Sequence, residues 1–251
     1  MQNQPDRKRY RFIGCEIIYR EACRLAATVP DRVDLEFLRK GLHNVDTPEM
    51  LAAIQERIDA ADEGGYDAIL LGYARCSDGL VGIQARSTPL VIPRAHDCIT
   101  LFFGSRQAYQ EYFDAHPGTY YLTTGWIERN APADEEDQPT RSRRGADGQS
   151  YEQLVAKYGR DNADYIVQTL GGWRKNYTHI LYLQMGVCDE SPFIEQARRR
   201  ARREGWQFLL REGDWTLLEK LFRGRWDDDF VVLAPGERII ARNDERILDG
   251  Q

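Results

Sequence analysis

The sequence predicts an α/β protein in which a mostly parallel sheet carries helices on both faces, as in Rossmann-like and flavodoxin-like folds. The N-terminal half alternates short apolar runs with amphipathic helical patterns, and this alternation is typical of β-α units. The run at residues 66–73 is apolar almost throughout, which indicates a strand buried on both faces. With 251 residues, of which 42% are hydrophobic and 29% charged, the chain is long enough to form a sizeable core.

The expected elements of the first half follow one another at short intervals. Thr47 is a typical N-cap, Pro48 suits the first helical turn, and Leu51, Ile54 and Ile58 recur at helical spacing. Signals of the same kinds predict strands at residues 10–15, 33–38, 66–73 and 89–94, a strand or strand end at 118–126, and helices at 16–29, 47–61 and 97–116.

The composition changes after residue 129. Residues 130–150 form an acidic block followed by a basic block with Pro and Gly, as is typical of a surface loop or a linker. We therefore expect residues 1–129 to form one α/β portion and residues 151–251 a second, smaller one. In the second portion the patterns indicate helices at residues 151–170, 195–205 and 214–224, and strands at residues 178–186, 206–213 and 229–237.

Charge and hydropathy exclude several classes of partner. The net charge of −6 argues against a general affinity for nucleic acid or for anionic membranes. The arginines at residues 195–205 are interleaved with Glu, Gln and Ala, which favours the solvated face of an amphipathic helix. No apolar window approaches the length of a membrane span, and the first residues lack the hydrophobic stretch of a signal peptide. We expect a cytoplasmic protein with no nucleic-acid partner and no membrane partner.

Side chains that can bind a metal ion follow the first four predicted strands. Cys15 ends the first strand, His43 lies beyond the second, Cys76 follows the third, and His96 and Cys98 follow the fourth. The carboxyl ends of parallel strands meet at one edge of an open sheet, where such folds bind their ligands. Thiolate and imidazole are ligands that zinc selects, and four of them complete a tetrahedron. The sequence therefore predicts a mononuclear zinc site at Cys15, Cys76, His96 and Cys98, with His43 as a further candidate ligand.

Two carboxylates accompany these residues. Glu16 and Asp97 are candidate hydrogen-bond acceptors for a metal-bound imidazole, or replacement oxygen ligands. A purely structural explanation stays open, because cysteine is among the most buried residue types and often only fills space. We prefer that explanation for Cys23, which lies inside the first predicted helix. The cysteines number five, an odd set in a chain too large to need disulfides, so we expect reduced thiols.

Four further residues are candidates for substrate binding. Arg94 and Arg106 lie near the end of the fourth strand, where two guanidinium groups could hold a carboxylate or a phosphate. Pairing with nearby acidic side chains is the alternative. Tyr120 and Trp126 lie close to the same edge and could form the floor of a pocket, although core packing is the commoner role of aromatic residues.

Several longer motifs carry a resemblance to a known family. They are GCEI at 14–17, GLH at 41–43, ILLGYARCSDGLVGI at 69–83, VIPRAHDCITLFFGSR at 91–106, PGTYYLTTGWIE at 117–128 and, more thinly, DDFVVLAPG at 228–236. Together they resemble the family catalogued as domain of unknown function 1638. The resemblance implies a cytoplasmic protein of bacteria or archaea that accompanies corrinoid-dependent methyl-transfer systems. The chain departs from the family pattern in ARCSDG, where Arg75 and Asp78 replace small or neutral residues.

A shorter resemblance concerns chemistry. The tripeptide HDC at 96–98 is similar to the His-x-Cys zinc motif of methyltransferases that pass a methyl group from a corrinoid to a thiol. In such enzymes zinc lowers the pKa of the incoming thiol and holds it as a nucleophilic thiolate.

These observations favour a zinc-thiolate enzyme or accessory factor in corrinoid-linked one-carbon transfer. Its ligand would be a small-molecule thiol or methyl donor, and its partner a corrinoid protein or a methyltransferase. A second hypothesis is an iron–sulfur protein in which Cys15, Cys76 and Cys98 hold a cluster with one open iron. A third is a non-catalytic module that carries a corrinoid or a metal. The Asp-x-His-x-x-Gly signature of corrinoid-binding proteins does not occur in the sequence, which argues against the third hypothesis.

Overall fold

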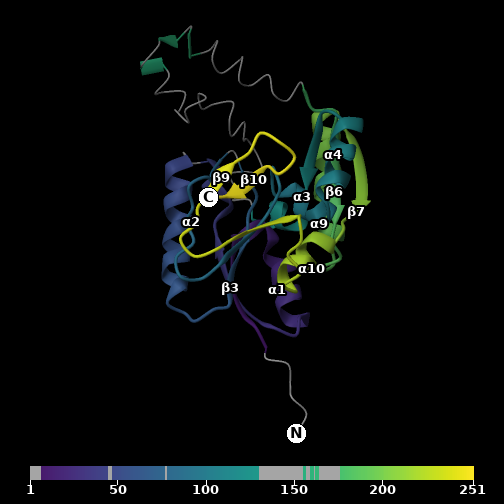
Figure 1. Cartoon of the computed structure of the whole chain (residues 1–251). Coiled ribbons are helices and arrows are strands. Elements are labelled where there is room, and N and C mark those ends of the chain that lie inside the picture. The colour runs from purple at the N-terminus through teal and green to yellow at the C-terminus, as the bar shows by residue number, and fades with distance from the viewer. Residues whose placement is uncertain are drawn as a thin grey trace.

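The fold is described from a computed structural model (Figure 1). The structure describes residues 7–44, 47–76, 78–129, 155–156, 159–160, 162–163 and 176–251, and for residues 43 and 44 the backbone alone. The loop or linker expected at residues 130–150 lies outside these ranges, as does most of the helix expected at residues 151–170.

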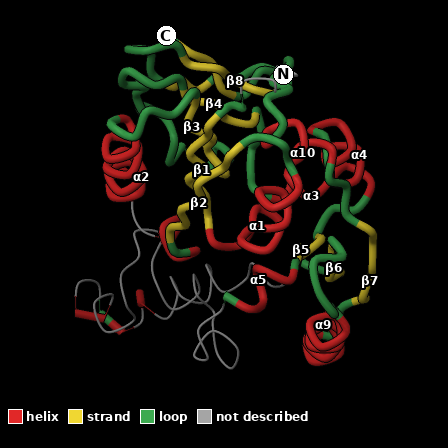
Figure 2. Tube along the Cα trace, turned by 90° about the horizontal axis from the view of Figure 1, so that it is seen from below, coloured by secondary structure: helices red, strands yellow, loops and turns green. Residues whose placement is uncertain are grey.

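The larger sheet has five strands in the order β2-β1-β3-β4-β8 (Figure 2). The strands are β1 Arg9–Cys15, β2 Arg32–Leu38, β3 Ala68–Gly72, β4 Leu90–Pro93 and β8 Phe230–Leu233. The first four are parallel, and β8 runs antiparallel to β4. This confirms a mixed α/β fold with a mostly parallel sheet, whereas the Rossmann-like or flavodoxin-like assignment stays a prediction. The chain passes from β1 outward to β2 and returns to β3 on the other side of β1.

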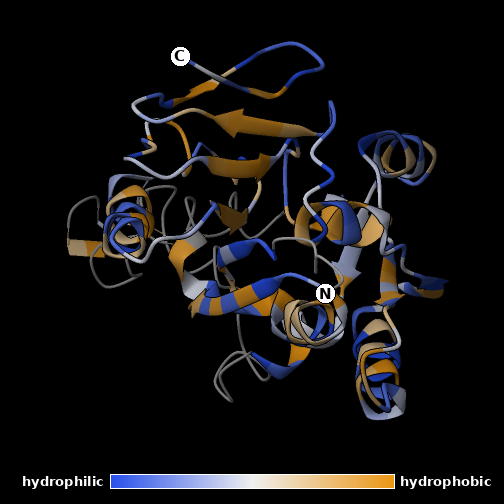
Figure 3. Ribbon diagram, turned by 60° about the horizontal axis from the view of Figure 1, so that its bottom comes forward, coloured by the Kyte–Doolittle hydropathy of each residue, from blue (hydrophilic) through white to orange (hydrophobic). Residues whose placement is uncertain are grey.

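Both faces of this sheet are covered by helices. Because successive side chains of a strand point to opposite faces, Phe12 and Leu70 pack on one side while Ile13 and Ile69 pack on the other. The first face is covered by α1 Tyr19–Thr28, α3 Ile99–Phe103 and α10 Thr216–Phe222, and the second by α2 Thr47–Asp62. All residues of β3 are buried, as its apolar run predicted. The hydrophobic colour of the central strands in Figure 3 shows the same pattern.

A second sheet of three parallel strands lies on the far side of α1, α3 and α10 (Figure 2). Its strands are β5 Thr119–Leu122, β6 His179–Gln184 and β7 Gln207–Glu212, in the order β5-β6-β7. Leu181 and Leu183 of β6 face the central helices, whereas Ile180 and Tyr182 face α9 Ser191–Glu204. Both the five-stranded and the three-stranded sheet combine strands from before and after residues 130–150. The division of the chain into two portions stays a prediction.

Two expectations about the elements are corrected by the structure. The helix expected at residues 97–116 is interrupted, because Gly104 has a φ of 72° and Ser105 caps a new helix, α4 Arg106–Ala115, by accepting a hydrogen bond from the Ala108 amide. The short antiparallel strands β9 Ile239–Ala241 and β10 Leu248–Gly250 were not expected, since three residues are too few for an alternating pattern to be recognised. Within the described ranges, no helix is both long enough and apolar enough to cross a membrane.

A close backbone contact positions the segment that follows β1. The short helix η1 Glu16–Ile18 follows Cys15, and α5 Thr124–Glu128 packs directly on it. A Cβ atom added at Gly125 would lie 1.8 Å from the carbonyl oxygen of Ile17. Only glycine allows the two backbones to approach so closely.

Replacing Gly125 by Ala should lower the free energy of unfolding by at least about 2 kcal/mol, because the methyl group fits only if α5 and η1 separate. Gly41→Ala is the matched control, since no atom lies within 4 Å of a Cβ atom added there. For the control we expect a change below about 1 kcal/mol. Urea unfolding followed by circular dichroism measures both values, and equal stabilities would contradict the close packing of α5 on η1.

Candidate functional site

Three cysteines lie at the carboxyl edge of the larger sheet. Cys15 is the last residue of β1, Cys76 lies in the loop after β3, and Cys98 is the N-cap of α3 after β4. The loops after β3 and β4 are joined by backbone hydrogen bonds, from Arg75 to the carbonyl of Ala95 at 2.9 Å and from Cys76 to the carbonyl of His96 at 3.1 Å. The chain thereby brings together residues from the ends of three neighbouring strands.

The three thiol groups are partly buried, and a charge on Cys76 affects the pKa of the other two. Burial, with a smaller contribution from a charge on Cys76, raises the pKa of Cys15 to about 12. Burial raises the pKa of Cys76 to about 11. For Cys98, burial again has the largest effect, and charges on Cys76 and Cys15 add to the increase in pKa. All three thiols are therefore neutral at pH 7 in the metal-free protein.

The loop that carries Cys76 has a strained backbone. Cys76 has a φ of 46° and Asp78 a φ of 70°, and neither residue is a glycine. Residues held in this left-handed region cost about 1 to 3 kcal/mol each and occur preferentially at functional sites. The side chain of Arg75 pairs with Asp78, and its Nη1 donates to the carbonyl of Arg242 at 3.2 Å. These contacts hold the loop in the conformation that buries the Cys76 thiol.

The two carboxylates expected beside the metal site lie near the thiols. The Oδ1 atom of Asp97 accepts a hydrogen bond from the Ile99 amide at 3.0 Å, and its Oδ2 atom accepts one from the Tyr109 hydroxyl at 2.8 Å. A charge on Asp97 raises the pKa of Cys76 and of Cys98.

Glu16 lies beside the thiol of Cys15. Its Oε1 atom accepts a hydrogen bond from the Lys40 amide at 2.9 Å, and its Oε2 atom lies 4.0 Å from the Nη1 atom of Arg129. A charge on Glu16 raises the pKa of Cys15, whereas Lys40 lowers it. Glu16 therefore already has partners on η2 Lys40–Asn44 and at the end of α5.

Tyr73 was not recognised from the sequence. It follows β3 directly, is 3% exposed, and its hydroxyl group has no hydrogen-bond partner among the described residues. Burial raises its pKa, and charges on Cys15 and Cys76 raise it further. The Tyr73 hydroxyl therefore lies beside the thiols as an unsatisfied polar group. The sequence shows only an apolar run that continues through Gly72. This run predicted a buried strand and did not indicate that the next residue would place a polar group beside the thiols.

The candidate imidazole ligands are placed differently from the thiols. His96 has an exposed side chain, although its carbonyl group is part of the site. The side chain of His43 lies outside the described residues. As the side chains stand, no group of three or more His, Cys, Asp and Glu residues in the described part of the chain could hold a metal ion. The zinc site stays a prediction that requires side-chain movement.

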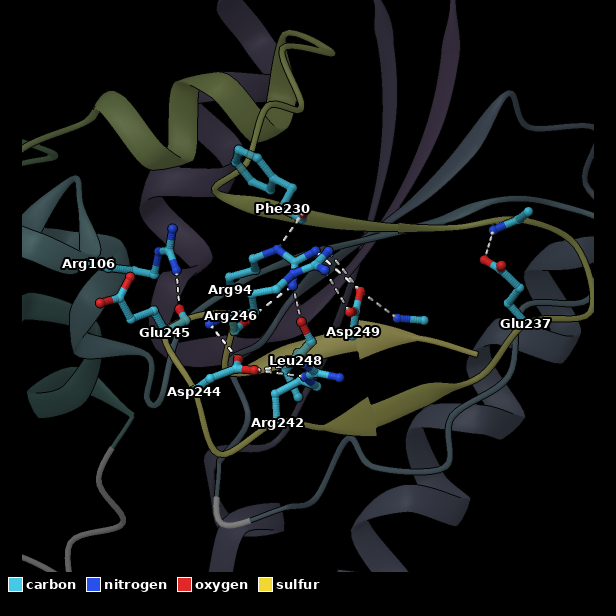
Figure 4. Close-up of polar contacts among 12 residues, drawn as sticks. Arg94, Arg106, Phe230, Glu237, Arg242, Asp244, Glu245, Arg246, Leu248 and Asp249 are labelled. Atoms are coloured by element: carbon cyan, nitrogen blue, oxygen red, sulfur yellow. Dashed lines mark hydrogen bonds and ion pairs between the residues drawn. The ribbon is translucent and has the colours of Figure 1, made fainter.

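Arg94 is buried, and its guanidinium group binds the C-terminal segment (Figure 4). It donates hydrogen bonds to three carbonyl groups, those of Phe230, Arg246 and Leu248. Its Nη2 atom also lies 3.5 Å from the Oδ1 atom of Asp249. Arg94 therefore holds the β9-β10 hairpin against β8, and its role in substrate binding stays a prediction.

The other three candidate substrate-binding residues lie in different surroundings. Arg106 donates to the carbonyl of Glu245 (Figure 4) and lies 3.6 Å from Asp229. Tyr120 belongs to the hydrophobic cluster of the smaller sheet, with the guanidinium of Arg200 4.4 Å from its ring centre. Trp126 lies on α5, and the Nζ atom of Lys40 is 4.9 Å from its ring centre.

Comparison with known proteins gives one match. The model of a family described as "protein of unknown function (DUF1638)" matches residues 37–222. No curated protein and no solved structure matches the chain.

The pKa of Cys76 makes its reactivity testable. With a pKa of about 11, the thiol of the native, metal-free protein should react with iodoacetamide at pH 8 at least about 100 times more slowly than an unperturbed cysteine. Mass spectrometry of the peptides measures the rate, and the same protein in guanidinium chloride is the control. Native and unfolded rates of the same size would contradict the burial of this thiol.

Replacing Arg94 by Met should lower the free energy of unfolding by about 3 kcal/mol, because buried carbonyl groups lose a charged donor. Arg86→Met is the control, since the ion pair between Arg86 and Asp59 is exposed and is worth less than about 1 kcal/mol. Urea unfolding at pH 7 compares both variants with the original chain. A loss for Arg94→Met no larger than that for Arg86→Met would show that Arg94 does not anchor the hairpin.

Proposed function

The chain belongs to this family of proteins of unknown function, DUF1638, and from that premise we propose that it binds zinc through Cys15, Cys76 and Cys98 and uses the metal in one-carbon transfer. One observation carries the proposal: three partly buried thiols lie at or just beyond the ends of neighbouring strands, and a charge on Cys76 raises the pKa of Cys15 and of Cys98. Thiolates are the ligands that zinc prefers, and zinc binding to such a group releases its protons.

The chemistry of the donor set fits a thiophilic cation. Three buried thiols are neutral as they stand, and they can all ionise together only if a positive charge compensates them. The Tyr73 hydroxyl group lies beside Cys15 and Cys76 and has no hydrogen-bond partner among the described residues. A bound ion and its ligands would give this group a partner. The order of the strands reverses between β1 and β3. Open α/β sheets of the expected Rossmann-like or flavodoxin-like kind bind their ligands beside such a reversal.

Three protein thiolates leave one coordination position for His96 or for a substrate thiol. When bound, zinc would lower the pKa of a thiol and hold it as a nucleophile. The chain's own residues position the ligands: Asp97 fixes the turn that carries Cys98, and Tyr109 in turn orients Asp97. Trp126, whose ring centre lies 4.9 Å from the Nζ atom of Lys40, is the proposed contact for a bound small molecule. A corrinoid protein or methyltransferase is the proposed partner, in line with the family resemblance.

A second candidate is an iron–sulfur protein. The favouring observation is that the three thiols come from three different strand ends, while the side chain of His96 is exposed. A cluster held by three cysteines keeps one iron open to a substrate. The two candidates differ in metal, colour and stoichiometry.

Elemental analysis of full-length protein purified without oxygen tests the proposal. We expect about one zinc per chain, a colourless protein, and at least a tenfold loss of bound zinc in Cys98→Ser. Cys23→Ser is the matched control, since Cys23 lies on α1 away from the strand ends, and its zinc content should not change.

A brown protein with about four iron atoms per chain would favour the iron–sulfur candidate instead. Protein without either metal, or zinc that survives Cys98→Ser, would overturn the zinc proposal. The transfer step is tested separately, by following the loss of the methyl group from methylcobalamin when the zinc-loaded protein and a small thiol are added. Tight corrinoid binding without transfer would indicate a carrier.

A further inference from the structure

Strand β7 forms an open edge of the smaller sheet. It is the last strand in the order β5-β6-β7, and Figures 1 and 2 show it at the outer border of the protein. One edge of β7 pairs with β6, and no strand of the described residues pairs with the other edge. An unpaired edge offers backbone donors and acceptors to another chain, so proteins usually protect it with charged side chains, proline or a bulge.

The pairing with β6 determines which backbone groups lie on the open edge. The amide of Gln207 donates to the carbonyl of Thr178 at 2.9 Å, so the backbone groups of Gln207 face β6. Successive residues of a strand direct these groups to alternate edges. The amide and carbonyl groups of Phe208, Leu210 and Glu212 therefore point away from β6, toward the open edge.

An apolar side chain lies at the centre of this edge. Leu210 is 47% exposed, and it lies on the same face of β7 as Phe208, which packs against the apolar cluster beneath α9. The edge strand of the larger sheet, β2, is different, because one of its faces carries Arg32, Asp34 and Glu36. Such a row of charges discourages pairing with another chain, and β7 has an exposed leucine in the corresponding place.

Opposite charges lie at equal distances on the two sides of Leu210. Two residues before it, the ring of Phe208 has the guanidinium of Arg198 5.1 Å from its centre. Two residues after it, Glu212 is exposed on the same face of the strand. Neither Arg198 nor Glu212 has an ion-pair partner in the described part of the chain. Arg202, the next arginine on this side of α9, is already paired with Glu195 at 2.8 Å.

We propose that two copies of this chain join through β7, whose open edges pair in antiparallel orientation about a twofold axis at Leu210. A twofold axis pairs a residue with its own copy and exchanges the residues on its two sides. Leu210 therefore lies opposite the partner's Leu210, and Phe208 lies opposite the partner's Glu212. Side chains directly opposite each other have Cβ atoms about 5 Å apart, so the carboxylate of the partner's Glu212 comes within reach of Arg198.

The second copy fits this edge because the surface is complementary to itself. The pairing covers the exposed leucine with an identical leucine and supplies hydrogen bonds to the open backbone groups. It also forms the ion pair between residues 198 and 212 twice, once on each side of the axis. The interface uses none of the cysteines at the strand ends, so it is independent of the proposed metal.

Sedimentation velocity of the full-length protein tests this proposal. We expect a dimer of about 58 kDa, twice the chain mass of 29.0 kDa. Leu210→Lys should raise the dissociation constant of the dimer at least tenfold, because it places two like charges face to face at the axis. Val232→Lys is the matched control, since Val232 also lies on a strand and is also 47% exposed. Its dissociation constant should equal that of the original chain.

Exchange of the two charges tests the register. Arg198→Glu and Glu212→Arg should each weaken the dimer about tenfold, whereas the double variant should recover most of the original affinity, because the ion pair forms again with its charges reversed. Circular dichroism and the melting temperature establish that every variant is folded. A monomeric original chain, a dimer that survives Leu210→Lys, or a double variant weaker than both single variants would overturn the proposal.

Discussion

The ring of Phe12 lies across Gly14 and Gly72, the last paired residues of β1 and β3. A Cβ atom at Gly14 would lie 2.5 Å from this ring, and one at Gly72 would lie 2.3 Å from it. Because neither residue has a side chain, Phe12 can pack against Phe222 of α10 while both strands end at the same level. Cys15 follows at once, and the loop after β3 can then bond to the loop after β4. The convergence of the three thiols depends on this contact.

Burial has different consequences for the thiols and for Glu21. Thiols ordinarily ionise above pH 8, so burial leaves Cys15, Cys76 and Cys98 neutral at little cost in stability. Carboxylates ordinarily ionise near pH 4, so Glu21 is charged at pH 7 unless its surroundings prevent it. With its raised pKa, Glu21 gains protons in the folded state over the range in which the unfolded chain has lost them, so stability falls as the pH rises from about 4.5 to about 7.

The strands and most helices of the larger sheet could be predicted from local patterns, because β3 and β4 are buried on both faces and α2 has a regular apolar stripe. The positions of Cys15, Cys76 and Cys98 at or just beyond strand ends were predicted in the same way. Contacts between segments far apart in the sequence could not be predicted from local patterns. Arg94, for example, finds its partners more than 130 residues later in the chain. The break at Gly104 could have been suggested by the Gly-Ser pair, but the close approach of Asp214 to this glycine could not.

A row of charged side chains connects the strand end that carries Cys15 with α5 and α1. Arg129 lies 4.0 Å from Glu16, beside Cys15, and 3.7 Å from Glu128, whose other oxygen binds Arg20 at 2.8 Å. All these residues lie on η1, α1 and α5 or directly beside them, and Gly125 holds α5 against η1. Because Arg129 lies near both carboxylates, the charge on Glu128 affects the position and charge balance of Arg129 and, through it, of Glu16. This row of ion pairs is thus the connection between the strand end that carries Cys15 and the helices α5 and α1.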